Sequence, residues 1–117
     1  EVKRLADVPE QIIRRYFSKI RNGACPTYRI AQGLKGMVTF ARLNLSTPPF
    51  PMKGPFDVIF CRNVMIYFDN EVRRRLLEDM YRLLKPGGYL MVGHSESLSG
   101  MLSNFKFVES ATYQKCG

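Results

Sequence analysis

The sequence is a chain of 117 residues that is 45% hydrophobic and carries a formal net charge of +8. A chain of this length can bury one modest core, so its composition predicts one compact globular unit and argues against a second independent domain. It shows no signal peptide and no stretch of about 18 apolar residues, which argues against secretion and membrane insertion and favours a cytoplasmic protein. The positive charge suits nucleic acid, an anionic membrane surface or an acidic protein surface, and charge alone does not choose among them.

The three cysteines indicate a reducing compartment. Cys25, Cys61 and Cys116 are odd in number and widely spaced, without a Cys-x-x-Cys pair or a nearby group of histidines. Neither a disulfide framework nor a zinc site is therefore expected, and we predict no bound metal. Cys61 lies in an apolar run and is interpreted as a small buried hydrophobic residue.

The first predicted element is a helix over residues 8–20. Asp7 and Glu10 resemble a capping box, with Pro9 in the first turn. The apolar residues then recur at helical spacing, at Ile12, Ile13, Tyr16, Phe17 and Ile20. The other face is basic, with Arg14, Arg15, Lys19 and, just beyond, Arg21. This face is either solvated or docks onto an acidic partner, and the sequence leaves both possibilities open.

A β-hairpin is predicted next. Residues 27–31 and 37–44 alternate β-branched or aromatic residues with polar ones, and the segment between them contains Gly33 and Gly36. We therefore expect an antiparallel hairpin subdomain over about residues 25–43. The prolines within residues 46–55 cannot sustain a helix or a central strand, so that segment is predicted to be a loop.

The following part of the chain has the pattern of a parallel α/β unit. Residues 56–61 are a short apolar run typical of a strand buried on both faces. Asp69 can cap a helix, along which the apolar stripe consists of Val72, Leu76, Leu77, Met80, Leu83 and Leu84. Lys-Pro-Gly-Gly at residues 85–88 ends this helix, and residues 89–93 are the next buried strand. Strand, helix and strand predict a right-handed parallel crossover.

Two further features belong to this unit. On the polar side of the helix, Glu78 is four residues from both Arg74 and Arg82, a spacing that favours ion pairs. Residues 105–108 and 111–114 are two more short strands with a tight link, expected as a hairpin on the sheet edge. An edge of such a sheet that stays unpaired invites self-association of the chain.

Candidate functional residues follow the predicted strands. In an open parallel sheet, ligands collect beyond the carboxyl ends of the strands. Arg62 and Asn63 directly follow the strand over residues 56–61, so a large cation and an amide are expected at the mouth of the sheet. The alternative is that Asn63 only fixes the turn and that Arg62 pairs with a helix terminus. His94 follows the next strand and either makes a structural hydrogen bond or contacts the mouth of the site.

Several segments together resemble one protein family. The most specific is Phe-Asp-Val-Ile-Phe-Cys-Arg-Asn-Val-Met-Ile-Tyr-Phe-Asp at residues 56–69. The similarity continues through residues 84–88 and 93–98 and reaches back to residues 15–17 and 40–45. Over nearly its whole length the chain resembles the chemotaxis-receptor glutamate methyltransferases, which use S-adenosylmethionine. The resemblance implies an α/β fold, the second half of a doubly wound, Rossmann-like methyltransferase sheet with an inserted antiparallel β-hairpin subdomain.

The resemblance also implies roles for individual residues. Asn44 and Leu45 match a pair that flanks the adenine of the cofactor, and Arg62 with Asn63 match a pair that borders cofactor and substrate. Tyr67 matches a tyrosine that lines the methyl-transfer site, so Arg62 and Tyr67 are the expected catalytic residues. The implied cofactor is S-adenosylmethionine, with S-adenosylhomocysteine as its product. The implied partner is the cytoplasmic domain of methyl-accepting chemoreceptors, whose C-terminal peptide the hairpin grips in some members.

Other parts of the family pattern are not found in this sequence. They are the glycine-rich loop after the first strand, the acidic residue after the second strand and the basic N-terminal helical domain. We therefore expect residues 1–117 to be a C-terminal fragment of the catalytic domain that is inactive alone. A rival interpretation is a non-catalytic module that docks a receptor. A nucleic-acid binder fits less well, because the aromatic residues lie in apolar stripes rather than between Lys and Arg.

Overall fold

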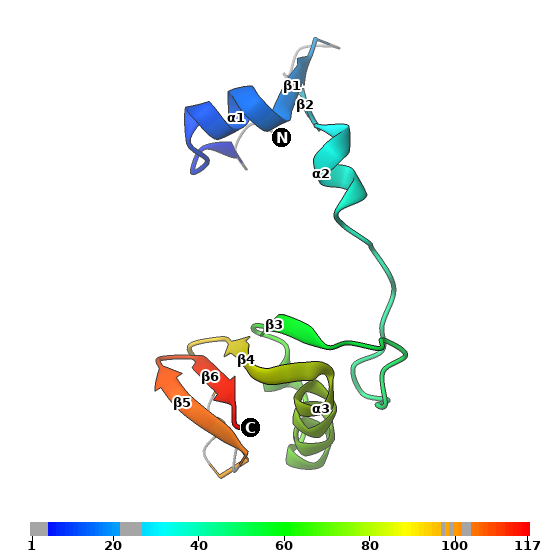
Figure 1. Cartoon of the computed structure of the whole chain (residues 1–117), viewed down its shortest axis with the longest axis vertical. Helices are drawn as coiled ribbons and strands as arrows, with labels where there is room; N and C mark the ends of the chain where they lie inside the picture. The colour runs from blue at the N-terminus through cyan, green and yellow to red at the C-terminus, as the bar shows by residue number, and fades with distance from the viewer. Residues whose placement is uncertain (1–4, 22–26, 97, 99, 102–103) are drawn as a thin grey trace. The chain divides into compact units, whose positions relative to one another are not determined.

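The computed structural model describes residues 5–21, 27–96, 98, 100–101 and 104–117. The chain divides into two compact units, residues 1–42 and 43–117, where the sequence predicts one. Figure 1 labels the elements of both units. The first unit contains a two-stranded sheet and the second a four-stranded sheet. Within the described residues, no helix is long and apolar enough to cross a bilayer.

In its described residues, 5–21 and 27–42, the first unit contains two short helices and a β-hairpin. α1 spans Glu10–Tyr16, and β1 (Phe17–Ile20) continues directly from it. β2 (Thr27–Ile30) pairs antiparallel with β1, and α2 spans Gln32–Gly36. No residue of α1 is buried, so the basic face of this helix is open to solvent.

The predicted helix over residues 8–20 is wrong in its C-terminal part. The helix ends at Tyr16, and Phe17 takes up extended backbone with φ −127° and ψ 139°. Residues 17–20 pair with β2 instead, and the N–H of Ala31 donates to the carbonyl oxygen of Tyr16 at 2.7 Å beside this pairing. Pairing with a strand distant in sequence therefore overrides the helical periodicity.

One strand of the predicted hairpin is confirmed and the other is wrong. β2 lies where a strand is expected, but its partner is β1, and residues 37–44 contain no strand. α2 occupies the predicted turn. Met37 and Phe40 expose 81% and 93% of their surface, and the alternating pattern of their segment does not by itself produce a strand. That residues 25–43 are a subdomain inserted in a larger sheet stays a prediction.

The second unit is built on a four-stranded sheet in the order β3-β4-β6-β5. β3 (Phe56–Cys61) and β4 (Leu84–Val92) are parallel. β5 (Phe105–Glu109) and β6 (Thr112–Lys115) form an antiparallel hairpin that joins the sheet through β6. The predicted parallel pair and C-terminal hairpin are thus confirmed. β3 is an outer strand, and self-association through its edge stays a prediction.

β4 begins earlier than predicted. The Lys-Pro-Gly-Gly segment at residues 85–88 does follow the helix, but it belongs to the strand. The register with β3 passes from Phe56 opposite Leu84 to Val58 opposite Tyr89, which is a bulge with the extra residues on β4. The backbone is not extended throughout this segment, however, because Gly87 has φ 76°, in the left-handed region that favours glycine.

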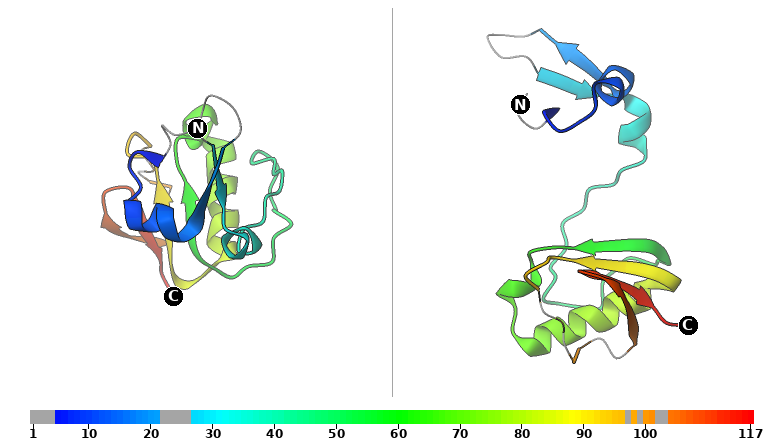
Figure 2. Two further views of the ribbon diagram at one scale, coloured as in Figure 1. Left: turned by 90° about the horizontal axis from the view of Figure 1, so that it is seen from above. Right: turned by 90° about the vertical axis from the view of Figure 1, so that its left-hand side faces the viewer.

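α3 (Asn70–Leu83) connects β3 to β4 and follows η2, a short 3-10 helix over Met65–Tyr67. Asp69 caps α3 as predicted, since its carboxylate accepts a hydrogen bond from the N–H of Val72 at 2.9 Å. The apolar stripe of α3 faces the sheet, and Figure 2 shows the helix on one face of the four strands.

The ion pairs on α3 differ from the predicted ones. Arg74 pairs with Glu71 at 2.9 Å and Arg82 pairs with Asp79 at 2.6 Å, so both pairs are three residues apart and neither uses Glu78. Asp79 is only 6% exposed, and a buried carboxylate needs a partner. This need explains why Arg82 pairs with Asp79 rather than with the exposed Glu78.

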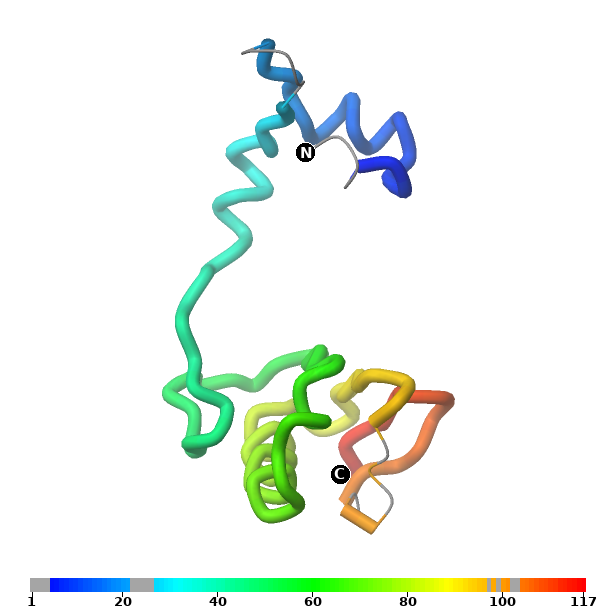
Figure 3. The backbone as a smooth tube through the Cα atoms, turned by 180° about the vertical axis from the view of Figure 1, so that it is seen from behind, coloured from blue at the N-terminus to red at the C-terminus, as the bar shows by residue number. Residues whose placement is uncertain are grey.

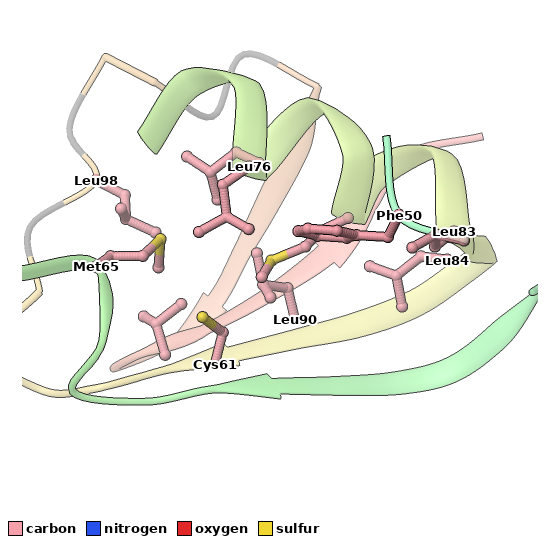
Figure 4. Close-up of a cluster of buried hydrophobic side chains, with 11 residues drawn as sticks. Phe50, Cys61, Met65, Leu76, Leu83, Leu84, Leu90 and Leu98 are labelled. Carbon is pink, nitrogen blue, oxygen red and sulfur yellow. The ribbon is translucent and has the colours of Figure 1, made fainter. Parts of the chain in front are cut away.

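The hydrophobic core lies between α3 and the sheet (Figure 4). Its least exposed large side chains are Met65, Leu76, Leu83, Leu84, Leu90 and Val92. Phe50, from the loop that precedes β3, completes the core beside Leu83 and Leu84. The other face of β3 is open, since Phe60 exposes 69% of its surface. The predicted burial of this strand on both faces is therefore wrong, because α3 covers only one of them.

Candidate functional site

A cavity of about 430 Å³ lies beside β3. Its walls come from residues 43–52, from β3 with the loop that follows it, and from α3. The lining is mostly apolar and consists of Leu43, Leu45, Phe50, Met52, Phe56, Val58, Ile59, Phe60, Cys61, Arg62, Val64, Met80 and Leu83. Two of the predicted site residues, Leu45 and Arg62, therefore meet at one cavity, and Arg62 brings the charge to its lining.

The loop over residues 43–55 is fixed to α3 by a buried carboxylate. Asp79 accepts hydrogen bonds from the N–H of Phe50 at 2.7 Å and from Nε of Arg82 at 2.6 Å. Arg82 also donates to the carbonyl oxygen of Phe50 at 3.2 Å. Figure 3 follows this loop as it passes α3 on its way to β3. The wall of the cavity that carries Leu45 is thus held in place by contacts made at Phe50.

Asn44 lies next to Leu45 in the chain but does not line the cavity. Its side-chain oxygen accepts hydrogen bonds from the N–H of Ser46 at 3.1 Å and from the Ser46 hydroxyl at 2.8 Å. This arrangement fixes the local turn. Leu45 is half-buried in the cavity wall. A role for Asn44 beside adenine stays a prediction.

The predicted site residues after β3 occupy one loop. Arg62 is exposed and contributes to the cavity lining. Asn63 has φ 59°, the left-handed region that asparagine tolerates better than most residues, so it does fix the turn. Tyr67 ends η2 with 80% of its surface exposed and is not among the cavity residues. The structure places Arg62 and Leu45 in the lining of the same cavity, whereas Asn63 and Tyr67 follow Arg62 in the same loop and are not among the lining residues.

The carboxylate of Glu96 holds this loop, although the sequence gives no role to that residue. Glu96 follows β4 and is 7% exposed. Its Oε1 accepts from the N–H groups of Val64 at 3.0 Å and Met65 at 2.8 Å, and its Oε2 from those of Asn63 at 3.1 Å and Gly93 at 2.6 Å. Burial opposes ionisation, but the N–H groups, that of Gly93 foremost, hold the pKa of Glu96 below its ordinary value of 4.5.

Acid is expected to destabilise the second unit through two buried carboxyls. In Asp79, as in Glu96, burial is outweighed by hydrogen bonds, here from Arg82 and from the N–H of Phe50, which hold the pKa below its ordinary 3.8. Because each pKa is lower in the folded state, the unfolded chain binds protons first, and the stabilisation is present above the ordinary values and lost as pH falls. The urea midpoint should therefore drop between about pH 5 and pH 3.

Measuring the urea midpoint against pH in two variants tests whether Glu96 causes this pH dependence of stability. Glu96→Gln is expected to start less stable at neutral pH and to lose less between about pH 5 and pH 3, because its amide does not titrate. Glu78→Gln, at an exposed position of α3, should follow the unaltered chain. If Glu96→Gln kept the full pH dependence, Glu96 would not be its source.

Cys61 is held as an uncharged thiol. Its side chain is 5% exposed in the core, and burial, followed by the nearby charge of Glu96, raises its pKa to about 11. The interpretation of Cys61 as a small buried hydrophobic residue is confirmed. Cys25 lies outside the described residues, and Cys116 is exposed.

Alkylation should distinguish the two described cysteines. In the folded chain near pH 7.5, iodoacetamide is expected to modify Cys61 at least about 100-fold more slowly than Cys116, because only an accessible thiolate reacts. Peptide mapping by mass spectrometry measures both rates in one sample, and urea should remove the difference. Comparable rates in the folded chain would show that Cys61 is accessible and ionised.

His94 makes a structural contact. Its Nδ1 lies 3.3 Å from the hydroxyl oxygen of Ser110, and the histidine is not among the residues that line the cavity. Of the two alternatives that the sequence leaves open, the structure favours the structural hydrogen bond.

Comparison with known proteins gives the family. Residues 1–114 match the family described as "CheR methyltransferase, SAM binding domain". The chain is 38% identical over 112 residues to the chemotaxis protein methyltransferase of Borreliella burgdorferi, covering 96% of this chain and 38% of that protein. It is 39% identical over 109 residues to the chemotaxis protein methyltransferase of Escherichia coli, covering 93% of this chain and 38% of that protein. It is 44% identical over 93 residues to the chemotaxis protein methyltransferase of Klebsiella aerogenes, covering 80% of this chain and 32% of that protein.

The fold agrees with this match. A mixed α/β sheet with a parallel strand pair connected by a helix is consistent with an S-adenosylmethionine-dependent methyltransferase fold. The match includes the loops after β3 and β4, and the chain spans less than two fifths of the length of these relatives. The resemblance noted in the sequence is confirmed, and the chain belongs to the CheR methyltransferase family, through the domain of that family that binds S-adenosylmethionine.

Proposed function

We propose that the chain is the C-terminal part of the catalytic domain of a chemotaxis protein methyltransferase. A full-length protein that carries residues 1–117 would transfer a methyl group from S-adenosylmethionine to glutamate side chains in the cytoplasmic domain of a chemoreceptor. The family match and the names of the relatives support this activity. The structural observation that carries the proposal is the meeting of Leu45 and Arg62 at one cavity beside β3.

The cavity lining fits the adenine side of the cofactor. The two faces of the flat adenine ring are suited to apolar contacts, and a cavity of about 430 Å³ with aliphatic and aromatic walls accommodates a ring of this kind. Arg62 adds one polar side chain. Of the described residues, those that line the cavity include no carboxylate, and we propose that a partner for the ribose hydroxyls comes from elsewhere in the full-length protein.

Methyl transfer to a carboxylate does not require proton transfer by the protein. S-adenosylmethionine supplies the methyl group on a positively charged sulfonium. A glutamate side chain with a reference pKa of about 4.3 is already ionised near neutral pH, so no general base is needed. The residues of the chain therefore contribute by positioning the reactants and by excluding water, and the apolar cavity walls suit the second task.

Arg62 and Tyr67 are the residues that we assign to positioning. Arg62 lies directly after β3, where its guanidinium can orient the substrate carboxylate. A tight ion pair would restrain the nucleophile, so we assign Arg62 to orientation rather than to a clamp. Tyr67 presents an exposed phenol on the same loop and can line the approach of the receptor side chain.

The proposal is tested by labelled methyl transfer. A full-length protein carrying the chain is incubated with S-adenosylmethionine labelled in its methyl group and with the cytoplasmic domain of a chemoreceptor. Label should enter the receptor domain and be released as methanol by mild base, because a glutamyl methyl ester hydrolyses in base and an N-methyl group does not. Base-stable label would identify another acceptor. Receptor binding without transfer would favour the non-catalytic docking module.

A further inference from the structure

Among the described residues, the carboxylate of Glu96 links the loops after β3 and β4 by hydrogen bonds. Three successive N–H groups of the first loop, from Asn63 to Met65, point to its carboxylate, and the N–H of Gly93 in the second loop points to it as well. Hydrogen bonds to an ionised acceptor are roughly twice as strong as neutral ones. The backbone next to Arg62 is therefore set by a residue that is 33 positions away from Asn63 in the sequence.

The space around this carboxylate leaves little room for another arrangement. A Cβ atom at Gly93 would lie 2.4 Å from Oδ1 of Asn63 and 2.8 Å from Oε2 of Glu96. The two loops thus touch through a position without a side chain, while Asn63 holds a left-handed conformation. A shift of the carboxylate would leave four buried or partly buried N–H groups unpaired and would release the turn that follows Arg62.

We propose that Glu96 is a positioning residue of the methyl-transfer site, which sets the course of the loop that carries Arg62, Asn63 and Tyr67 by accepting hydrogen bonds from its backbone. This inference rests on the proposed methyltransferase function. Glu96 acts through the loop, because both of its carboxylate oxygens are already engaged by N–H groups. Its removal should lower the rate of the chemical step beyond any effect on stability.

A stability-matched control is available at the other end of the sheet. Lys115 on β6 donates hydrogen bonds from Nζ to the carbonyl oxygens of Tyr81 at 2.8 Å and Leu84 at 2.7 Å. β6 is antiparallel to β4, with Gln114 opposite Tyr89, so Lys115 lies toward the amino end of β4, whereas Glu96 follows its carboxyl end. Lys115→Met removes charge-assisted bonds to the backbone, as Glu96→Gln does, at a place that holds no predicted site residue.

The experiment compares kcat in the full-length protein with both substrates saturating, at a temperature where each variant is folded. Glu96→Gln, whose amide nitrogen cannot accept these bonds, should lose on the order of 10²-fold in kcat, because displacement of a site loop by about 1 Å has an effect of that size. Lys115→Met should stay within about threefold of the unaltered protein at a similar loss of thermal stability. Should Glu96→Gln not fold, Glu96→Asp, which keeps the charge, is expected to fold and to lose about tenfold.

The outcomes separate this inference from the proposed function. A loss confined to the glutamate variants supports a positioning role. Equal kcat values in Glu96→Gln and Lys115→Met, or in Glu96→Asp and the unaltered protein, would overturn it and leave Glu96 with a structural role only. Absence of methyl transfer by the unaltered protein would instead refute the proposed function.

Discussion

Replacing Arg62 by alanine in the full-length protein is expected to lower methyl transfer on the order of 10²-fold, which is the loss typical of a misplaced reactant at a reacting centre. Arg62 is exposed at the end of β3 and contributes no buried contact to the core, so the fold should survive. The loss should therefore appear in steady-state kinetics while the thermal unfolding midpoint stays within a few degrees.

Arg75→Ala is the matched control for this experiment. Arg75 is an exposed arginine on α3 that does not line the cavity, and its removal changes the net charge by the same amount. It should leave methyl transfer within about twofold, since surface substitutions away from a site have small effects. Near-native activity of Arg62→Ala with intact stability would remove Arg62 from the site.

Replacing Gly93 by alanine is expected to destabilise the second unit by about 2 kcal/mol, because an added methyl group in a filled space forces backbone shifts. The new Cβ would lie 2.4 Å from Oδ1 of Asn63 and 2.8 Å from Oε2 of Glu96, so these side chains would have to move and the hydrogen bonds of Glu96 would be disturbed. Urea denaturation followed by circular dichroism measures the change in the free energy of unfolding, and S-adenosylhomocysteine affinity in the full-length protein should fall as well.

Gly33→Ala provides the comparison for Gly93→Ala. Gly33 lies in α2, and a Cβ there meets nothing within 4 Å. Alanine favours a helix over glycine by up to about 1 kcal/mol, so this variant should be neutral or slightly more stable. If Gly93→Ala proved as stable as Gly33→Ala, the close approach of the two loops would not be a constraint on the fold.

The parts of the fold that the sequence predicts correctly are those with local causes. Asp69 and the apolar stripe specify α3 without a distant partner, since a cap and a helical period act within a few residues. Phe17 fits the helical period of α1 equally well, yet it belongs to β1 because β2 pairs with residues 17–20. Only the partner strand distinguishes the two outcomes, and the spacing of residues 8–20 does not contain it.

The site also contains residues that the sequence predicts and residues that it does not. Leu45 and Arg62 are predicted through the family resemblance, and the structure brings them to one cavity. Glu96 and Asp79 are not predicted, because each accepts hydrogen bonds from backbone groups 29 to 33 residues away. The position of Glu96 after β4, at the sheet edge where ligands collect, was one indication of a role. An acidic residue in a loop is, however, most often exposed.

We propose that this chain holds the adenine side and the methyl-transfer side of a cofactor site. In the full-length protein, S-adenosylhomocysteine should bind in the micromolar range. The 117-residue chain spans less than two fifths of its relatives and would lack several hydrogen bonds to the cofactor, each contributing about 0.5–1.5 kcal/mol. A total loss of about 4 kcal/mol weakens binding by about three decades, into the millimolar range.

Calorimetric titration of S-adenosylhomocysteine into the full-length protein and into the 117-residue chain tests this claim most directly. We expect a difference of about a thousandfold between the two dissociation constants, with the full-length protein in the micromolar range. Micromolar binding by the 117-residue chain alone, or no binding by the full-length protein, would contradict it.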